Sequence, residues 1–215
     1  FEFVPILLSS RVRRNMLVDR RDDLLFPTGD VTESESMVDF FSVFGNNRPV
    51  EIEIGIGKGR FLIDAAKRNP DSNFLGIEWA MKYLRLAHKR ALNSNLSNMR
   101  FLRADAREFV EFFLPANSVH AFHIYFPDPW PKKRHHKRRL INTEFRIEVE
   151  RTLSSGGLIW LATDHSEYFG AMIEVFEASS TLEPIELCWA GAKTNYEQKY
   201  LNEGKLIFRQ VFCRK

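Results

Sequence analysis

Three glycines at alternating positions form the clearest ligand-binding pattern in this sequence. Gly55, Gly57 and Gly59 follow the apolar run 50–54 and precede an amphipathic stretch, as where a strand passes through a tight turn into a helix. Glycine permits such a turn and lets the backbone approach a ligand where a Cβ would collide. A plain strand–helix turn needs one glycine and not three, so the spacing favours a ligand-binding loop.

Glu53 stands directly before this loop and bears on the identity of the ligand. Dinucleotide sites use the spacing G-x-G-x-x-G, which lets helix amides receive a pyrophosphate. Here the spacing is G-x-G-x-G. A carboxylate beside it would repel a pyrophosphate but would tolerate an ammonium and a sulfonium group. The pattern therefore favours S-adenosylmethionine as the ligand.

Two more carboxylates follow the next two apolar runs. Glu78 comes 19 residues after Gly59, near the offset of ~20 residues at which an acidic side chain accepts hydrogen bonds from ribose hydroxyls. Asp105 follows the third run, from which a side chain can reach the adenine edge. Acidic residues at strand ends also commonly face solvent, but three such ends in succession favour a nucleoside site.

An aspartate between two prolines and a series of Lys and Arg residues follow the fourth apolar run. Asp128 lies between Pro127 and Pro129, and proline restricts the backbone and excludes a helix. The segment 132–139, called the basic segment below, contains six Lys or Arg residues and no acid. A solvated helix face would mix bases with acids, whereas an unmixed run repels itself without an anionic partner. Because ligands of doubly wound sheets bind at the carboxyl ends of the strands, we expect Asp128 beside the cofactor and nucleic acid at the basic segment.

The charge of the whole chain supports one localised contact rather than a uniformly basic surface. The 215 residues include 31 Lys and Arg and 28 Asp and Glu, a net charge of +3, so without the basic segment the balance is 25 − 28 = −3. His135 and His136 lie inside the segment. We expect them to contact phosphate or the rim of the site, and we expect no metal, because no other ligand cluster accompanies them.

Two later stretches offer short polar side chains that can grip a base edge. Thr163, Asp164 and His165 end the fifth apolar run, on the same sheet edge as Asp128. The stretch 194–199 precedes the last apolar run. Each stretch can equally provide a helix cap or loop hydrogen bonds.

The elements that must position these residues alternate from residue 50 onward at the spacing of βα units. Strands are expected at 50–54, 73–77, 99–102, 119–126 and 158–162, and helices at 60–68, 81–92, 107–113, 142–153 and 166–178, with Ser166 as the last N-cap. The tail predicts strands at 185–189 and 206–213 with no helix between them. This order predicts an α/β fold: a mostly parallel sheet with helices on both faces and an antiparallel C-terminal pair. We expect residues 1–48 to form an N-terminal extension that packs on a domain spanning 49–215.

Composition excludes several classes of protein. No apolar run approaches the ~18 residues of a spanning helix, so no membrane partner is expected. The 19 Phe, 4 Trp and 5 Tyr residues require a core and argue against disorder. Cys188 and Cys213 offer no disulfide framework, which suits a reducing cytoplasm. The chain opens at Phe1 rather than Met, which leaves open a targeting segment before it; the stretch 1–8 alone is too short and unflanked to be read as one.

The run 126–140, FPDPWPKKRHHKRRL, closely resembles the signature of the tRNA (guanine-N7-)-methyltransferase family. Further blocks resemble that family in the same order: 53–59, 76–78, Thr163 and Asp164 with Tyr168 and Met172, and 194–199. The resemblance covers roughly residues 37–215. Its Pro-Asp-Pro-Trp block with the basic tail is highly specific, whereas the glycine loop is shared with most class I methyltransferases. The opening of the chain does not match the basic arm with which family members often start.

The resemblance implies a class I methyltransferase fold, a Rossmann-like seven-stranded sheet with an antiparallel C-terminal hairpin. It implies methyl transfer from S-adenosylmethionine to N7 of guanine 46 in the tRNA variable loop, which forms 7-methylguanosine, and it assigns catalysis to Asp128. Motif by motif, the cofactor would contact Glu53, Gly55, Gly57, Glu78, Asp105 and Asp128. The substrate would be held by Lys132, Asp164, Thr194, Asn195, Tyr196 and Glu197. RNA would contact Arg134, His135, His136, Lys137, Arg138 and Arg139.

Two other functions remain open at this point. A methyltransferase of the same fold could act on a protein or a small molecule, with the basic segment holding an acidic partner. Alternatively, the chain could be a nucleic-acid-binding module without catalytic activity. The three carboxylates of the expected cofactor site, Glu53, Glu78 and Asp105, are all present and argue against this alternative. The sequence is compatible with a monomer or a homodimer.

Overall fold

The computed structural model describes residues 37–187 and 194–215. The predictions for residues 1–36 of the extension and for residues 188 and 189 of a tail strand lie outside the described residues. So do the side chains of four residues of helix α7 (Asn195–Asn202), namely Asn195, Tyr196, Gln198 and Leu201.

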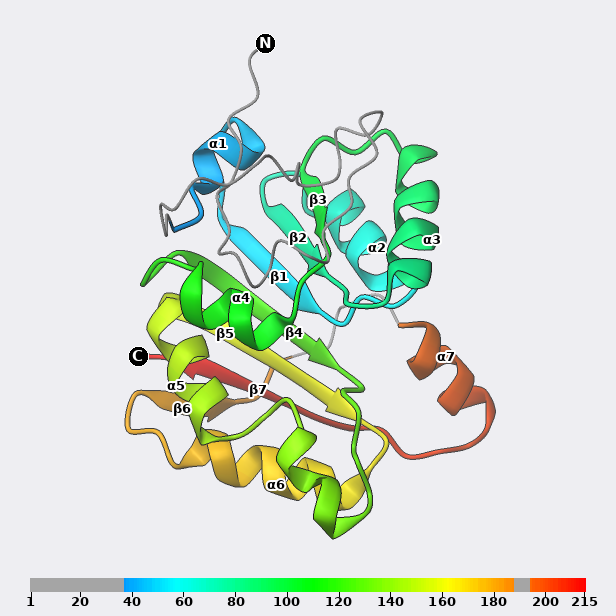
Figure 1. Ribbon diagram of the computed structural model, residues 1–215, viewed down its shortest axis with the longest axis vertical. Coiled ribbons are helices and arrows are strands. Elements are labelled where there is room, and N and C mark those ends of the chain that lie inside the picture. Colours follow the sequence, from blue (N-terminus) through cyan, green and yellow to red (C-terminus); the bar gives the residue numbers. More distant parts are fainter. Residues whose placement is uncertain (1–36, 188–193) are drawn as a thin grey trace.

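Within the described residues, one seven-stranded sheet forms the centre of the fold (Figure 1). The strands lie in the order β3-β2-β1-β4-β5-β7-β6, in which β1 to β5 are parallel and β7 is antiparallel to both β5 and β6. The predicted α/β fold with an antiparallel C-terminal pair is confirmed. The strands are Val50–Ile54 (β1), Asn73–Ile77 (β2), Met99–Leu102 (β3), Val119–Tyr125 (β4), Leu153–Thr163 (β5), Leu182–Ile185 (β6) and Phe208–Arg214 (β7).

Helices cover both faces of this sheet (Figure 1). Among the described residues, none of them is both long and apolar enough to cross a membrane. The helices besides α7 are Phe40–Phe44 (α1), Arg60–Arg68 (α2), Met81–Leu92 (α3), Ala106–Phe112 (α4), Thr143–Thr152 (α5) and Ser166–Glu177 (α6), and the 3₁₀ helix η2 spans Lys133–Arg138.

Two apolar clusters hold the helices on the sheet. One face buries Phe109 of α4, Phe145 of α5 and Phe176 of α6 against the strands. The other face buries Leu62 of α2 and Leu84 of α3. All five residues of β2 are buried, as expected for a parallel strand covered on both sides.

One glycine lets α2 approach the sheet closely. A Cβ on Gly76 would lie 2.5 Å from Leu62 Cδ2 and 2.9 Å from Ile56 Cγ2. Gly76 pairs with Glu53 across β1 and β2, so this contact also fixes the position of the glycine loop above the strand ends. Close helix–strand packing here therefore requires the missing side chain.

The described part of the N-terminal extension packs on the domain. Val38 donates its backbone N–H to the Phe113 carbonyl at 2.8 Å and is buried. Asp39 caps α1 by accepting a hydrogen bond from the Phe41 backbone N–H at 3.0 Å. Phe44, at the end of α1, joins the main core.

Three predictions about the C-terminal half are wrong. The fifth strand is Leu153–Thr163 rather than 158–162. The segment 154–157 follows the end of α5 as predicted, but it forms an irregularity within this strand, with Gly156 at φ +73°, between the pairs Leu153–Val119 and Leu158–Ala121. The sixth strand lies at Leu182–Ile185 rather than 185–189, because Pro184 is tolerated on the last strand of the sheet. His165 rather than Ser166 caps α6, since its Nδ1 accepts from the Tyr168 N–H at 3.2 Å.

The tail contains a helix where a loop is predicted. The apolar side chains in the sequence of α7, Tyr196, Tyr200 and Leu201, form too short a pattern to distinguish a helix from a loop. Thr194 Oγ1 accepts a hydrogen bond from the Glu197 N–H at 3.0 Å, as an N-cap does. Glu197 is 2 % exposed and is paired with Arg209 of β7. A long-range ion pair therefore anchors this helix, and local periodicity does not reveal it.

Candidate functional site

The glycine loop after β1 presents backbone to open space. Gly55, Gly57 and Gly59 all have positive φ, at 76°, 51° and 70°. A Cβ added to Gly55 or Gly57 would meet nothing within 4 Å, whereas one on Gly59 would lie 2.7 Å from Ala87 Cβ. The first two glycines therefore line an open cradle, and the third lets α3 pack against the start of α2.

Glu53 faces this cradle from the end of β1. It is 3 % exposed, and its Oε2 atom has no hydrogen-bond partner among the described residues. The pKa of the Glu53 carboxyl is raised to about 8, mainly because the group is buried; a hydrogen bond from the Leu62 backbone lowers the pKa, and the nearby charge of Glu78 raises it. A buried carboxyl with an unpaired oxygen is an acceptor for a cationic ligand group.

Glu78 and Asp105 support the loop and a helix at the ends of β2 and β3. Glu78 Oε2 accepts from the Gly57 N–H at 2.9 Å, and Oε1 accepts from the Ala80 N–H at 2.8 Å. Asp105 is exposed and caps α4, accepting from the Arg107 N–H at 2.8 Å. Both carboxylates lie at the predicted edge of the sheet.

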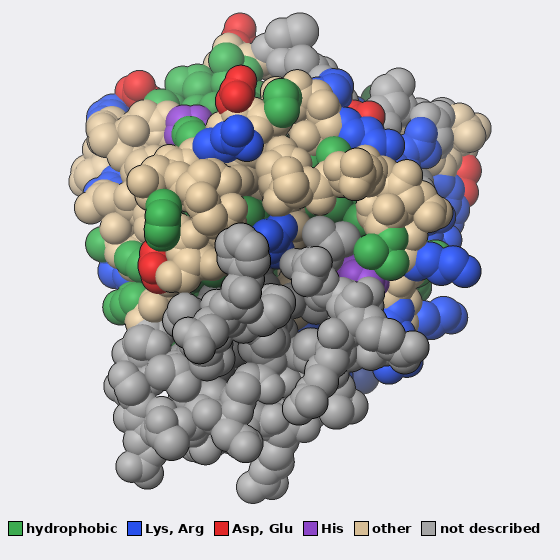
Figure 2. Space-filling model, turned by 90° about the horizontal axis from the view of Figure 1, so that it is seen from above, with side chains coloured by type: hydrophobic (Ala, Val, Ile, Leu, Met, Phe, Trp, Pro, Cys, Tyr) green, Lys and Arg blue, Asp and Glu red, His purple; other side chains and the backbone are tan. Residues whose placement is uncertain are grey.

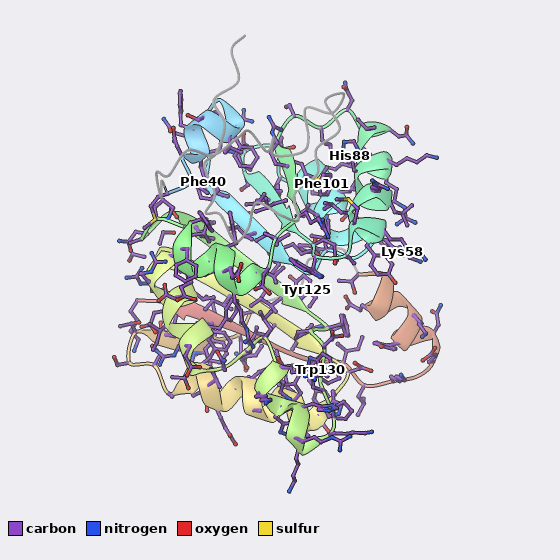
Figure 3. The ribbon with its side chains drawn as sticks, in the orientation of Figure 1. Phe40, Lys58, His88, Phe101, Tyr125 and Trp130 are labelled. Carbon is purple, nitrogen blue, oxygen red and sulfur yellow. The ribbon has the colours of Figure 1, made fainter. Side chains whose placement is uncertain are left out.

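The glycine loop and Glu53 border a cavity of about 200 Å³ at the carboxyl edge of the parallel strands. The cavity joins the glycine loop to α3, to the end of β4 and to α7, and Figure 3 shows Lys58 and Tyr125 on this side of the sheet. Glu78, Asp105 and Asp128 are not part of its wall. The lining includes Glu53, Gly55, Gly57, Lys58, Tyr83, Tyr125, Phe126, Thr194 and Lys199.

A larger hollow of about 370 Å³ lies on the same face of the sheet and shares Phe61 and Tyr125 with this cavity. Its wall contains a chain of hydrogen bonds, in which His123 joins Glu51 at 2.8 Å to the Tyr125 hydroxyl at 2.7 Å. No glycine loop borders it. We therefore assign ligand binding to the smaller cavity on chemical grounds.

Asp128 stands in a strained loop that is tied down on both sides. Phe126 and Trp130 adopt positive φ, at 53° and 43°, and bulky residues in this region cost on the order of 1–3 kcal/mol each. The Phe126 N–H donates to the Ala162 carbonyl of β5 at 2.7 Å. The Pro129 carbonyl accepts from Arg139 Nε at 2.8 Å. Between these anchors the Asp128 side chain is exposed.

The basic segment begins directly after this loop, in η2. Lys132, Arg134, Lys137 and Arg138 are exposed, and the Arg138 guanidinium lies 4.9 Å from the centre of the Trp130 ring. His135 and His136 are half-buried. Phe126 lines the cavity together with Gly57, so the basic segment and the glycine loop lie at one edge of the sheet, as the sequence predicts.

Arg139, the last residue of the basic segment, is buried instead of facing outward. Its side chain is 6 % exposed, and its guanidinium pairs with both carboxylate oxygens of Glu167 on α6. The guanidinium also lies 4.6 Å from the centre of the buried Tyr168 ring. The expected contact of this side chain with RNA is therefore replaced by contacts inside the protein.

Three of the remaining predicted substrate residues, Asp164, Thr194 and Glu197, have described side chains, and they lie in different surroundings. Asp164, at the end of β5, is 3.7 Å from Lys205 and partly exposed. Thr194 lines the cavity and caps α7. Glu197 faces inward to Arg209, so its carboxylate is engaged in the fold.

The amino-acid sequence of this chain is similar to those of known methyltransferases. The family described as "Putative methyltransferase" matches residues 47–210. A tRNA (guanine-N(7)-)-methyltransferase of Aliivibrio fischeri is 40 % identical over 160 residues, which cover 74 % of this chain and 67 % of that protein. The enzyme of the same name from Geobacillus thermodenitrificans is 37 % identical over 174 residues, 78 % of this chain and 80 % of that one. The chain belongs to the tRNA (guanine-N7-)-methyltransferase family.

A solved structure supports the fold of this family member. The 30S ribosomal A1408 methyltransferase from an uncultured bacterium superimposes with a TM-score of 0.57 at 19 % identity, covering 83 % of this chain and 95 % of that one. The strand order and this likeness establish the class I methyltransferase fold that the sequence predicts.

The cavity suits the methyl donor of such an enzyme. Gly55 and Gly57 leave space that a Cβ would fill, and Glu53 offers an unpaired acceptor oxygen. Sequence reasoning missed Tyr83 and Tyr125 in the wall. Nothing in the sequence marks them except their positions. Tyr83 lies in α3, the helix after β2, and Tyr125 is the last residue of β4, directly before the block that contains Asp128.

Proposed function

We propose that this chain transfers a methyl group from S-adenosylmethionine to N7 of a guanine in the tRNA variable loop, at position 46, in the cytoplasm. The names of the related enzymes support the reaction. The strongest support is that the cavity and the basic segment lie at the same edge of the sheet. The glycine-lined cavity opens at the same sheet edge as the exposed Asp128 and the exposed Lys and Arg side chains of the basic segment. Its wall includes the buried Glu53, one oxygen of which has no hydrogen-bond partner among the described residues.

Glu53, Gly55 and Gly57 would hold the donor, which supplies a methyl group on a positively charged sulfur. The open backbone at both glycines admits the ligand closely. A cationic group next to Glu53 favours the ionised carboxylate, so the energy that burial costs this residue is offset only when the cavity is filled. Glu78 keeps the loop in shape through the Gly57 N–H, and a ribose would share its carboxylate.

Guanine N7 has a free lone pair and no proton, so the reaction needs no base to create the nucleophile. The protein must place N7 in line with the methyl group and support the charge that develops on the ring. We assign Asp128 to orientation: its carboxylate would accept hydrogen bonds from the N1–H and the exocyclic amine. The strained, doubly anchored loop then serves to hold that carboxylate in one place.

The other substrate contacts would come from the rim. Lys132 and Asp164 flank the loop of Asp128, and Thr194 starts the α7 stretch that also includes Asn195 and Tyr196. Glu197, buried against Arg209, would hold this stretch in place rather than contact the substrate. Arg134, His135, His136, Lys137 and Arg138 would contact phosphates of the variable-loop region. Because N7 faces the deep major groove of A-form RNA, which side chains read poorly, the target must lie in a loop or leave its stack.

One assay separates this function from its rivals. The protein is incubated with isotope-labelled S-adenosylmethionine and bulk tRNA, and the RNA is digested to nucleosides. Label in 7-methylguanosine is the expected result. Label in added protein or small molecules without label in RNA would support a methyltransferase with another substrate, and RNA binding without any transfer would support a binding module.

A further inference from the structure

The outer face of α3 has a line of positive charge that the proposed function does not use. Lys82, Arg85 and Lys89, called the α3 stripe below, follow one another at i, i+3 and i+7 and are all exposed. That spacing places them on one side of the helix over ~10 Å. Within the described residues, none of the three makes an ion pair. Figure 2 shows Lys and Arg side chains gathered along the right-hand edge, the side on which α3 stands in Figure 1.

In α2 and α5, at least one basic side chain is paired within the helix, whereas no basic side chain of α3 forms such a pair among the described residues. Arg68 pairs with Asp64 in α2, and in α5 Arg146 pairs with Glu150. The sequence of α3, MKYLRLAHKRAL, contains no acid at all. Like charges three and four residues apart destabilise a helix, so this arrangement has a cost that an anionic partner would remove.

The α3 stripe begins at the mouth of the cavity. Tyr83, next to Lys82, lines the cavity together with Lys58. At the other end of the helix, Arg90 donates a hydrogen bond to the Lys58 carbonyl at 3.0 Å, which ties α3 to the glycine loop. The helix is therefore fixed relative to the site where the reaction would occur.

The α3 stripe and the basic segment lie on opposite sides of the cavity. Helix α3 connects β2 to β3, and the basic segment follows β4, while β1 with its glycine loop lies between β2 and β4 in the sheet. Figure 1 shows α3 beside β2 and β3, and Figure 3 shows Trp130, two residues before the basic segment, near the end of β4. An RNA strand bound to both surfaces would have to cross the cavity.

We propose that the α3 stripe is a second phosphate-binding surface for tRNA, which holds the RNA backbone on the far side of the target guanine from the basic segment. The inference rests on the proposed function and extends it. Two separated contacts hold the nucleotides that flank the target, so the target itself can leave its stack without releasing the tRNA. Phosphate contacts of this kind position the RNA and do not depend on its sequence.

The test compares two triple variants of equal charge change. Lys82→Gln, Arg85→Gln and Lys89→Gln together remove the α3 stripe and keep good helix formers. Arg48→Gln, Lys67→Gln and Lys215→Gln form the control. These three exposed bases lie before β1, at the end of α2 and at the end of β7, at the opposite edge of the sheet from the cavity. The dissociation constant for tRNA is measured for each protein at several salt concentrations, together with kcat and the affinity for S-adenosylmethionine.

The logarithm of the tRNA affinity falls linearly with the logarithm of the salt concentration, and each lost phosphate contact makes the slope of that fall less steep by ~0.7–0.9. The stripe variant should therefore lose ~2 from that slope and bind tRNA at least ~10-fold more weakly at low salt, with kcat at saturating tRNA and cofactor affinity within ~2-fold of the parent. The control variant should keep the parental slope. A stripe variant that also keeps it would overturn the proposal and leave an acidic protein as the partner of this face.

Failure of the two proposals can be told apart. If the parent protein forms no 7-methylguanosine but its tRNA affinity depends on the stripe, the proposed function fails and the second surface stands. If the parent protein is active and only the stripe has no effect on the salt slope, the second surface fails alone.

Discussion

Replacing Arg139 by Met tests whether this residue holds the Asp128 loop or contacts RNA. The guanidinium donates to the Pro129 carbonyl at 2.8 Å, pairs with Glu167 and lies 4.6 Å from the Tyr168 ring centre. Methionine keeps a long apolar side chain and removes all of these polar contacts. The matched control is Arg138→Met, the same change one residue earlier at an exposed position.

The size of the effect follows from burial. A charge-assisted hydrogen bond to the Pro129 carbonyl is worth about 1.5–3 kcal/mol, and a cation–π contact with a desolvated ring adds about 1 kcal/mol. Glu167 is 54 % exposed and regains water, so it adds nothing to this sum. The free energy of unfolding should fall by roughly 2–4 kcal/mol, which lowers the melting temperature of a chain of this size by roughly 5–15 °C.

The activity should fall for a geometric reason. Without its second anchor, the loop can relax the strain at Phe126 and Trp130 and shift Asp128. A displacement of about 1 Å costs about 10²-fold in rate, so kcat should drop by that order while the salt dependence of tRNA binding stays parental. Arg139→Lys keeps the charge but has no planar fork to bridge two elements, and it should restore little of the rate.

The assay is differential scanning calorimetry with steady-state kinetics at temperatures below both transitions. Arg138→Met removes only an exposed cation–π contact with Trp130, worth ~0.5–1 kcal/mol. It should therefore lower the melting temperature by at most ~4 °C and should show a higher KM for tRNA and a smaller salt slope. If Arg139→Met melts with the parent and loses salt slope as Arg138→Met does, Arg139 contacts RNA and the anchoring argument is wrong.

Three further predictions concern the cavity and the sheet. Asp128→Asn places an amide N–H opposite two guanine donors, so kcat should fall about 10²-fold, and near-parental kcat would contradict the orienting role. Because the pKa of Glu53 is raised to about 8 in the free protein, its ionisation destabilises the fold as pH rises from about 4.5 to 8. A cationic ligand reverses this preference, so calorimetry should show proton release and tighter S-adenosylmethionine binding with rising pH over the same range, and Glu53→Gln should abolish both trends. A Cβ on Gly76 would lie 2.5 Å from Leu62, so Gly76→Ala should destabilise the domain by about 1–3 kcal/mol in urea unfolding. A Cβ on Gly57 meets open space but is strained at φ +51°, so Gly57→Ala should cost about 1–2 kcal/mol of stability and should also weaken cofactor binding, which Gly76→Ala should leave intact below its unfolding transition.

Local patterns were sufficient for the first half of the sheet. The strands β1, β2 and β3 and the helix α3 have the bounds that alternating apolar runs predict, because each βα unit buries its own apolar stripe against the neighbouring unit. The glycine loop was readable for a similar reason. Its positive φ angles are a local requirement, and only glycine meets them without strain.

The tail was predicted less well because distant contacts decide it. Helix α7 depends on the pair between Glu197 and Arg209, which are 12 residues apart in the sequence and belong to different elements. The sixth strand depends on pairing with β7, and Pro184 argued against it locally. Sequence periodicity contains no information about such partners.

The amino-acid sequence by itself determined the βα alternation, the glycine cradle after β1 and the concentration of positive charge in one segment, since these depend on residues close together along the chain. Only the tertiary structure decided that Arg139 turns inward while Lys137 and Arg138 face solvent, and that one oxygen of the buried Glu53 has no hydrogen-bond partner in the described part of the chain. Both outcomes depend on which elements pack around a side chain. The direction of a side chain and the pKa of a carboxyl follow from its three-dimensional surroundings, and the sequence lists only the residues that can provide them.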